Sequence, residues 1–275
     1  MSSFNLTSEQ IAQYHQDGFI IVNRFLSSEE AQKLHSIAVN DDVMKKNAFD
    51  LNDQTGKKTK LSLWYTPSND TYGLLTKSDR MIHNVDKLLD GDAAVCHFHS
   101  KLMQKEPKVG GAWEWHQDYG YWYKNEFLFP EQMISVMIAI TDANKENGCL
   151  QVIKGTHKMG RVEHGFSGEQ VGASQRYVDL ALKTMEHVFV ELKAGDALFF
   201  HPNLLHRSEA NTSDFPRWSL ISCYNRASNI PYNEPNLSCI KPIETVADEA
   251  LMTSASEGLS GSTDFLIKEK DEALK

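Results

Sequence analysis

The stretch Trp113-Glu-Trp-His-Gln-Asp-Tyr-Gly-Tyr-Trp122 places an imidazole and a carboxylate within a strongly aromatic segment. His116 and Asp118 stand two residues apart, and side chains with this separation point to the same face of a β-strand. Such a pair suits a metal site, which requires a third ligand from elsewhere in the chain. His206, at the end of another strand-like run, would complete the two-histidine, one-carboxylate triad of non-haem Fe(II) oxygenases.

A second site element surrounds this histidine. A turn at Gly195 and the apolar run after it predict a buried strand that delivers His206 near its far end. Arg217 follows in another apolar strand, where a guanidinium is costly unless an anion pairs with it. Its planar fork suits a carboxylate bound by two parallel hydrogen bonds. Ser208 and Ser219 are candidates for additional hydroxyl contacts, so we expect one metal ligand and one carboxylate clamp in adjacent strands.

His15 and Asp17 repeat the same two-residue spacing near the N-terminus. Thr7 and Gln10 form a capping box, and Gly18 is a plausible end, so this segment is expected to be helical. Residues two apart on a helix lie roughly 200° apart around its axis and cannot share a ligand face. We therefore interpret this pair as structural or solvated.

The first 92 residues form the helical part of a single domain that is expected to span residues 1–275. A capping box at Ser27 and Glu30 predicts a second helix, and apolar positions three and four apart predict a third over 78–89. The polar segment 41–60 is expected to be a loop.

From residue 93 to about 230 the chain changes to short apolar runs punctuated by turn residues. We predict strands at 93–103, 112–118, 133–140, 149–153, 187–191, 196–201 and 218–225. Many short strands without intervening helices are typical of a β-sandwich or barrel. An insertion at about 160–185 is expected to be a loop with a short helix, and the tail 243–275 to be partly disordered or a partner contact.

Composition limits the function. The chain has 41% hydrophobic and 24% charged residues, as an ordinary soluble globular protein does. Its net charge of −9 argues against nucleic-acid binding, and it has no apolar run of the roughly 20 residues that a membrane span needs. It shows no secretory signal, and its four cysteines lack C-x-x-C spacing, so we expect a reduced, cytoplasmic location.

Several motifs together resemble the phytanoyl-CoA dioxygenase family of Fe(II)- and 2-oxoglutarate-dependent oxygenases. They are His116-x-Asp118, His206, Ser208, Asn211, Arg217 eleven residues after the distal histidine, the run 147–158 and the opening Tyr14-His-Gln-Asp-Gly-Phe-Ile-Ile-Val. The likeness covers roughly residues 8–230, and the block 113–122 is particularly similar to the ectoine hydroxylase branch.

The resemblance implies a mainly β fold, a double-stranded β-helix (jelly-roll, cupin-like) core with N-terminal helices packed outside. It implies Fe(II) on the triad, O2 as a co-substrate, and 2-oxoglutarate anchored by Arg217, with Lys101 as a further contact to that co-substrate. Relatives that halogenate replace the carboxylate ligand with a small residue. The presence of Asp118 therefore indicates hydroxylation, with release of succinate and CO2.

The substrate is expected to be a small or medium organic molecule, and the protein a monomer or homodimer. The aromatic residues favour a free polar metabolite such as an amino-acid derivative over a fatty acyl-CoA. Candidate pocket residues are Tyr119, Tyr121, Trp122 and Trp64, and core packing is the alternative for each. Two other classes remain: a jelly-roll hydrolase or isomerase with another divalent metal, and a non-catalytic module that binds a metal or keto acid.

Overall fold

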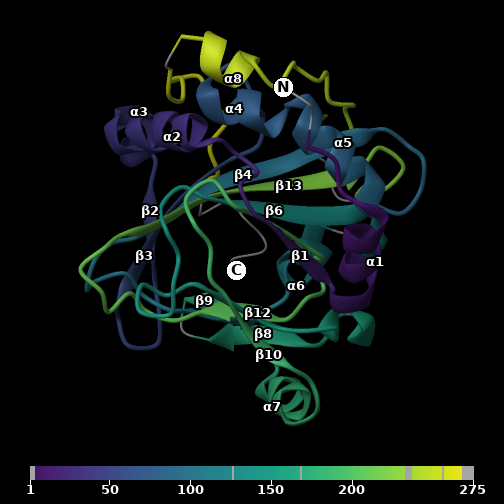
Figure 1. The fold of residues 1–275 in the computed structure, drawn as a ribbon. Coiled ribbons are helices and arrows are strands. Elements are labelled where there is room, and N and C mark those ends of the chain that lie inside the picture. The colour runs from purple at the N-terminus through teal and green to yellow at the C-terminus, as the bar shows by residue number, and fades with distance from the viewer. Residues whose placement is uncertain (1–3, 126, 168, 233–236, 256, 268–275) are drawn as a thin grey trace.

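Two antiparallel β-sheets face each other in the structure, a computed structural model that describes residues 4–125, 127–167, 169–232, 237–255 and 257–267 (Figure 1). The larger sheet has helices packed on its outer face, and the smaller sheet lies opposite its inner face. This arrangement is the double-stranded β-helix that was expected, with the N-terminal helices outside.

The larger sheet has seven strands and supplies most of the core. In spatial order they are β1 (Phe19–Val22), β11 (Ala197–Phe200), β6 (Met133–Ala139), β13 (Arg217–Arg226), β4 (Val95–Lys105), β3 (Lys58–Trp64) and β2 (Phe49–Asn52). Side chains alternate across its central strand β13. Leu220 and Tyr224 pack in the helix-side core, whereas Ile221 and Cys223 pack between the two sheets.

The smaller sheet has four strands. Their order is β10 (His187–Val190), β7 (Leu150–Ile153), β12 (His206–Ser208) and β5 (Trp113–His116). Within it His206 pairs directly with His116. A separate hairpin, β8 (His164–Ser167) with β9 (Gln170–Ala173), follows β7 and leads into α7 (Gln175–Thr184).

Seven further helices are described. They are α1 (Ser8–Asp17), α2 (Ser28–Asn40), α3 (Asp42–Lys46), α4 (Thr71–Thr76), α5 (Asp79–Leu88), α6 (Asp118–Trp122) and α8 (Ala250–Thr253). Side chains cap the N-termini of α1, α2, α3 and α4. Short 3-10 turns are η1 (Tyr123–Asn125), η2 (Pro130–Gln132), η3 (Thr156–Met159) and η4 (Leu237–Cys239). Both capping boxes, at Thr7 and Ser27, are present. None of the described helices has the length and apolar character needed to cross a membrane.

Three local predictions were wrong. The segment 41–60 is not a loop, because it contains α3, β2 and the start of β3, with Leu51 buried on the inner side of the sheet. The strand expected over 112–118 ends at His116, and Asp118 is already the first residue of α6. The insertion contains the β8–β9 hairpin in addition to its helix.

The C-terminal tail packs on the domain as far as the structure describes it. Leu259 is buried in the helix-side core, and its backbone N–H donates to Asp41 Oδ2 at 2.8 Å. Phe265 forms a β-bridge with Trp64. Residues 257–267 are thus packed against the domain, and the expectation of a partly disordered tail stays a prediction for residues 268–275, which lie outside the described residues.

The contribution of this tail is testable at its most buried leucine. We expect Leu259→Ala to lower the free energy of unfolding by roughly 2–5 kcal/mol, because it leaves a cavity in the core. Met252→Ala, in the same C-terminal segment but 44% exposed, should change it far less. Urea unfolding of both variants measures the difference, and equal stabilities would show that the tail does not pack.

A buried histidine makes stability depend on pH. Burial lowers the pKa of His97 from 6.5 to about 4. Between these values the unfolded chain holds a proton at this residue that the folded chain does not, so stability is complete above pH 6.5 and falls as the pH decreases. From this group alone we expect unfolding to require about 2 kcal/mol less at pH 5 than at pH 7.

Urea unfolding at the two pH values tests this expectation. His97→Asn should show a smaller loss of stability between pH 7 and pH 5 than the unmodified chain, although burial also lowers the pKa of His164 and His201. An unchanged pH dependence in the variant would contradict the role given to His97.

Candidate active site

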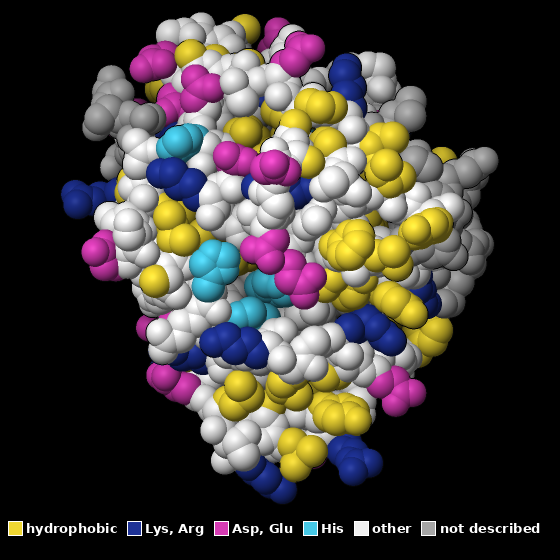
Figure 2. All heavy atoms as spheres, turned by 90° about the vertical axis from the view of Figure 1, so that its right-hand side faces the viewer, with side chains coloured by type: hydrophobic (Ala, Val, Ile, Leu, Met, Phe, Trp, Pro, Cys, Tyr) yellow, Lys and Arg dark blue, Asp and Glu magenta, His cyan; other side chains and the backbone are white. Residues whose placement is uncertain are grey.

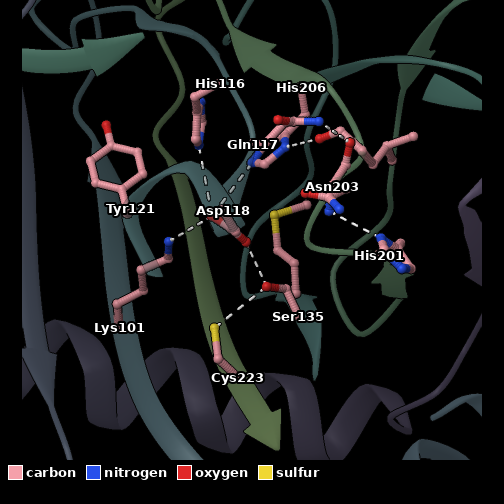
Figure 3. Close-up of polar contacts among 12 residues, drawn as sticks. Lys101, His116, Gln117, Asp118, Tyr121, Ser135, His201, Asn203, His206 and Cys223 are labelled. Carbon is pink, nitrogen blue, oxygen red and sulfur yellow. Dashed lines mark hydrogen bonds and ion pairs between the residues drawn. The ribbon is translucent and has the colours of Figure 1, made fainter. Parts of the chain in front are cut away.

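Two imidazoles and one carboxylate converge between the sheets (Figure 3). His116 is the last residue of β5, Asp118 the first of α6, and His206 the first of β12. Asp118 Oδ1 lies 3.8 Å from His116 Nε2 and 3.7 Å from His206 Nε2. One ligand atom from each residue falls within 4.8 Å of the other two, and all three residues are buried. In the described part of the chain this is the one such cluster of metal-ligand type.

Backbone carbonyls orient both imidazoles. His116 Nδ1 lies 2.7 Å from the carbonyl oxygen of Glu114, and His206 Nδ1 lies 2.8 Å from that of Leu204. A carbonyl only accepts, so each Nδ1 carries the proton and each Nε2 presents a lone pair toward Asp118. Burial lowers the pKa of His116 well below its ordinary value, and burial also lowers that of His206. Both rings are therefore neutral at neutral pH, as metal ligands must be.

Gln117, between the two ligands, points away from the cluster and anchors the turn. Its side-chain amide donates to the carbonyl oxygens of Gly160 and Asn203 at 2.8 and 2.7 Å, and its oxygen accepts from the Val162 N–H at 2.8 Å. Its backbone N–H donates to His164 Nε2 at 3.0 Å. These bonds fix the turn at which strand β5 becomes helix α6, so the ligands converge although Asp118 is not in the strand.

The carboxylate of Asp118 is compensated from the larger sheet. Ser135 Oγ donates to its Oδ2 at 2.5 Å, and Lys101 Nζ lies 3.7 Å from its Oδ1. Burial alone would raise the pKa of Asp118, but the Lys101 ammonium, the two imidazoles and the Ser135 hydroxyl together hold it below its ordinary value. The carboxylate is therefore charged and available to a cation.

A second part of the site, the subsite around Arg217 and Lys105, contains buried basic side chains. Arg217 is 3% exposed, and in the described part of the chain it forms no ion pair. Its Nη2 contacts Met137 Sδ at 3.6 Å, and Met137 lies two residues from Ser135 on the same face of β6. Lys105 pairs with Arg217 across β4 and β13 and is completely buried.

The charges of the subsite around Arg217 and Lys105 favour the binding of an anion. Burial lowers the pKa of Arg217 to about 10, and burial together with the nearby guanidinium lowers that of Lys105 well below its ordinary value. Ser219 lies two residues from Arg217 on the same strand face, and its buried hydroxyl has no hydrogen-bond partner. The Lys105 ammonium donates to the carbonyl oxygen of Glu209, so Arg217 is the buried cation that has no anionic partner among the described residues. A buried guanidinium without an ion pair and an unsatisfied hydroxyl are the features expected of a carboxylate subsite. The residues present thus fit both an N/O-ligated metal and a dicarboxylate.

The strands carrying these groups are not adjacent, contrary to the expectation. His206 and Ser208 lie on β12 of the smaller sheet, whereas Arg217 and Ser219 lie on β13 of the larger one. The strand after Gly195 ends at Phe200, and a turn separates it from β12. Strands β12 and β13 face each other across the interior, so a small molecule that contacts both of them would lie between the two sheets.

The aromatic candidates fall into different surroundings. Tyr121 packs edge-on against His116 at 5.6 Å between centroids, and its hydroxyl donates to the Val171 carbonyl. Tyr119 and Trp122 are buried in the core between the sheets, and Tyr119 donates to the Phe127 carbonyl. Trp64 was wrongly placed in the pocket, because it packs in the helix-side core on the opposite face of the larger sheet.

The second His-x-Asp pair is remote from this cluster. His15 is exposed on α1, and Asp17 forms an ion pair with Lys154 at 3.2 Å. Histidine side chains gather near the centre of the molecular face that Figure 2 shows. His157 lies 5.2 Å from His201 between ring centroids and contacts the His15 carbonyl oxygen. None of these three histidines belongs to the metal-type cluster.

Several residues of the site were not found from the sequence. Ser135 and Lys105 lie in largely apolar strands. A single polar residue within such a strand was the only sign in the sequence that they belong to the site. His164 was assigned to an insertion, yet its ring contacts α6 so closely that a Cβ at Gly120 would lie 2.3 Å from it. Glycine is therefore required where the ligand segment passes the hairpin.

Comparisons with known proteins agree with this geometry. The profile of the phytanoyl-CoA dioxygenase family matches residues 14–219. The L-proline trans-4-hydroxylase of Streptomyces griseoviridis is 31% identical over 173 residues, which cover 57% of this chain and 63% of that protein. The ectoine dioxygenase of Streptomyces avermitilis is 22% identical over 248 residues, which cover 84% of this chain and 83% of that protein.

A solved structure shares the fold. EctD from S. alaskensis with 2-oxoglutarate and 5-hydroxyectoine superimposes with a TM-score of 0.66 at 20% identity, covering 88% of this chain and 86% of that one. A jelly roll with two imidazoles and one carboxylate at its centre defines the class of non-haem Fe(II), 2-oxoglutarate-dependent oxygenases. Within that class, the chain belongs to the phytanoyl-CoA dioxygenase family.

The metal assignment is testable without any substrate. We expect His116→Ala and His206→Ala each to weaken Mn²⁺ binding by more than roughly a hundredfold, since loss of an outer hydrogen-bond partner alone costs 10–100-fold. Calorimetric titration measures the affinity, and circular dichroism checks the fold. His15→Ala is the matched control, and equal metal loss in this variant would contradict the assignment.

Proposed function

We propose that this protein hydroxylates a small organic molecule and couples the reaction to the decarboxylation of 2-oxoglutarate. The observation that carries the proposal is the combination of two features: the His116, Asp118 and His206 cluster, and the buried guanidinium of Arg217, which contacts Met137 between the sheets and has no ion pair among the described residues. A hydrolase or isomerase with the same three ligands would have no need of that buried cation.

The reaction is balanced by the co-substrates. Substrate C–H, 2-oxoglutarate and O2 give substrate C–OH, succinate and CO2, with one oxygen atom entering the alcohol and the other entering succinate. Bound Fe(II) supplies the oxygen chemistry. His116, Asp118 and His206 would hold the metal from one side and leave its other positions open for the keto acid and O2.

Individual residues then have separate tasks. Arg217 holds the far carboxylate of 2-oxoglutarate, and we assign Lys105 to the same subsite because it lies beside Arg217, fully buried. Ser219 offers its unpartnered hydroxyl to the same carboxylate. Ser208, buried beside His206 on β12, is a further hydroxyl contact. Holding both ends of the co-substrate fixes its reacting group and excludes water.

Ser135 and Gln117 act on the ligands and not on the substrate. The Ser135 hydroxyl occupies Asp118 Oδ2 and so leaves Oδ1 to face the metal. Gln117 holds the turn between the two ligands of the β5–α6 segment. Both are positioning residues, because they set the direction of a ligand atom.

The substrate class follows from the surroundings and from the relatives. L-proline and ectoine are the substrates that the names of two relatives state, and both names denote small polar molecules. Tyr121, which packs on His116, gives this site an aromatic wall of the kind expected for such a molecule. These points favour an amino-acid derivative over a fatty acyl-CoA.

An anaerobic titration tests the proposal. Addition of Fe(II) and then 2-oxoglutarate to the apoprotein should produce the visible charge-transfer band of a chelated keto acid. Arg217→Ala should weaken 2-oxoglutarate binding by roughly tenfold or more, the effect of losing a charge-assisted bidentate contact, and leave Fe(II) affinity nearly unchanged. Iron binding without the band would overturn the oxygenase function and favour a metal-dependent hydrolase.

A further inference from the structure

Strand β5, which ends at the ligand His116, is the edge strand of the smaller sheet. One of its sides pairs with β12, and no described strand pairs with the other. Such an edge needs partners, because a buried backbone N–H or C=O without one is costly. At β5 these partners are side chains of the segment 160–173. That segment contains the β8–β9 hairpin and, like α7, lies at the end of the molecule that the smaller sheet occupies (Figure 1).

Gln170, the first residue of β9, takes the place of a neighbouring strand. Its side-chain oxygen accepts from the Glu114 N–H at 2.9 Å, and its amide donates to the Ala112 carbonyl oxygen at 3.0 Å. The next residue, Val171, accepts from the Tyr121 hydroxyl at 2.8 Å and donates its N–H to the same hydroxyl at 3.2 Å. The hairpin is therefore bonded both to the strand before the metal ligands and to the helix after the first of them.

His164, the first residue of β8, holds the peptide between the two ligands. Its Nδ1 lies 2.8 Å from the Val162 carbonyl oxygen, which only accepts, so Nδ1 carries the proton. Its Nε2 is thus the acceptor for the Gln117 N–H at 3.0 Å. Burial lowers the pKa of His164 to about 4, so the ring is neutral at neutral pH and this lone pair is available. Gln117 is completely buried, which makes the acceptor necessary.

The imidazole of His164 is confined on two sides. A Cβ added to Gly120, in α6, would overlap the atoms of this ring. Val162, two residues before His164, is buried in a cluster with Trp115, and its N–H donates to Gln117 Oε1 at 2.8 Å. The ring therefore has little freedom to move away from the Gln117 N–H.

The peptide that His164 holds determines how the two ligands are directed. His116 ends β5 and Asp118 begins α6, so the backbone turns at Gln117. Rotation of this peptide would move the Asp118 carboxylate relative to the His116 ring, from which its Oδ1 is 3.8 Å away. The hydrogen bond from the Gln117 N–H to His164 opposes that rotation. It acts on the metal site although His164 is not one of the three clustered residues.

We propose that His164 is a positioning residue of the metal centre and that it links the β8–β9 hairpin to the metal through the Gln117 peptide. The inference rests on the metal site of the proposed function. It gives the inserted segment 160–185 a part in metal binding, in addition to its packing on the smaller sheet.

Calorimetric titration of the full-length apoprotein with Mn²⁺ tests this role. His164→Phe keeps a ring but removes the acceptor, and it should weaken Mn²⁺ binding by roughly tenfold or more, the effect of losing a partner that orients a ligand. His164→Gln places a carbonyl oxygen near the position of Nε2 and should bind Mn²⁺ within about threefold of the unmodified protein. His35→Phe, at a half-buried histidine of α2, is the matched control and should bind Mn²⁺ as the unmodified protein does.

The absorption spectrum of Co²⁺ in the same site separates positioning from a structural role. At saturating Co²⁺ the spectrum reports the arrangement of the ligands, so His164→Phe should change it and His164→Gln should restore it. Lower stability to urea with unchanged Mn²⁺ affinity and an unchanged spectrum would make His164 a structural residue and overturn the proposal. A loss in His164→Gln as large as in His164→Phe would also overturn it, because the acceptor would then not be the cause.

Gly120→Ala provides a second test, which keeps the imidazole and does not depend on the folding of His164→Phe. Its Cβ should displace the ring from the Gln117 N–H, so Mn²⁺ affinity should fall as it does in His164→Ala. Both changes remove the same hydrogen bond, so the double variant should bind Mn²⁺ within about threefold of either single variant. Fully additive losses would show that the two residues act separately and would contradict the proposal.

Failure of the proposed function would look different. If the unmodified protein lacks the Fe(II) and 2-oxoglutarate charge-transfer band, the proposed function fails, and the Mn²⁺ affinities still decide the role of His164. If the band is present and Mn²⁺ affinity is unchanged in His164→Phe, only the role of His164 fails.

Discussion

The buried carboxylate of Asp118 is the constraint on which the site depends, because a charge in a protein interior is stable only when it is compensated. Asp118 begins α6, directly after a strand of the smaller sheet, yet its compensating partners Ser135 and Lys101 belong to the larger sheet. The carboxylate thus links the two sheets at one point. Its two oxygens are divided between a fixed hydroxyl and the space into which both imidazoles point.

The inner face of the larger sheet is locally basic in a protein whose net charge is −9. Lys101, Lys105 and Arg217 all lie on it, and the burial of two of them prevents solvent from screening their charge. Such a surface attracts anions of low molecular weight. This property agrees with a dicarboxylate co-substrate.

Short-range signals in the sequence were reliable where the physics is local. The capping boxes at Thr7 and Ser27 formed as predicted, since each needs only residues three apart. The segment 41–60 was misjudged because its strands lie at the edge of the sheet, where alternate residues remain polar. The packing of residues 257–267 was not predicted, because the polar composition of the tail hides Leu259, whose burial depends on the distant helix-side core.

The sequence by itself determined the chemical types at the site: two histidines and an aspartate at a suggestive spacing, and an arginine in an apolar strand that calls for an anion. It could also support the choice of a jelly roll over a helical fold. Only the tertiary structure decided which partners those groups receive. Ser135 and Lys101 at Asp118, Lys105 at Arg217, and Trp64 on the far side of the sheet follow from strand register and sheet facing. These contacts join residues far apart in the chain, so no local pattern encodes them.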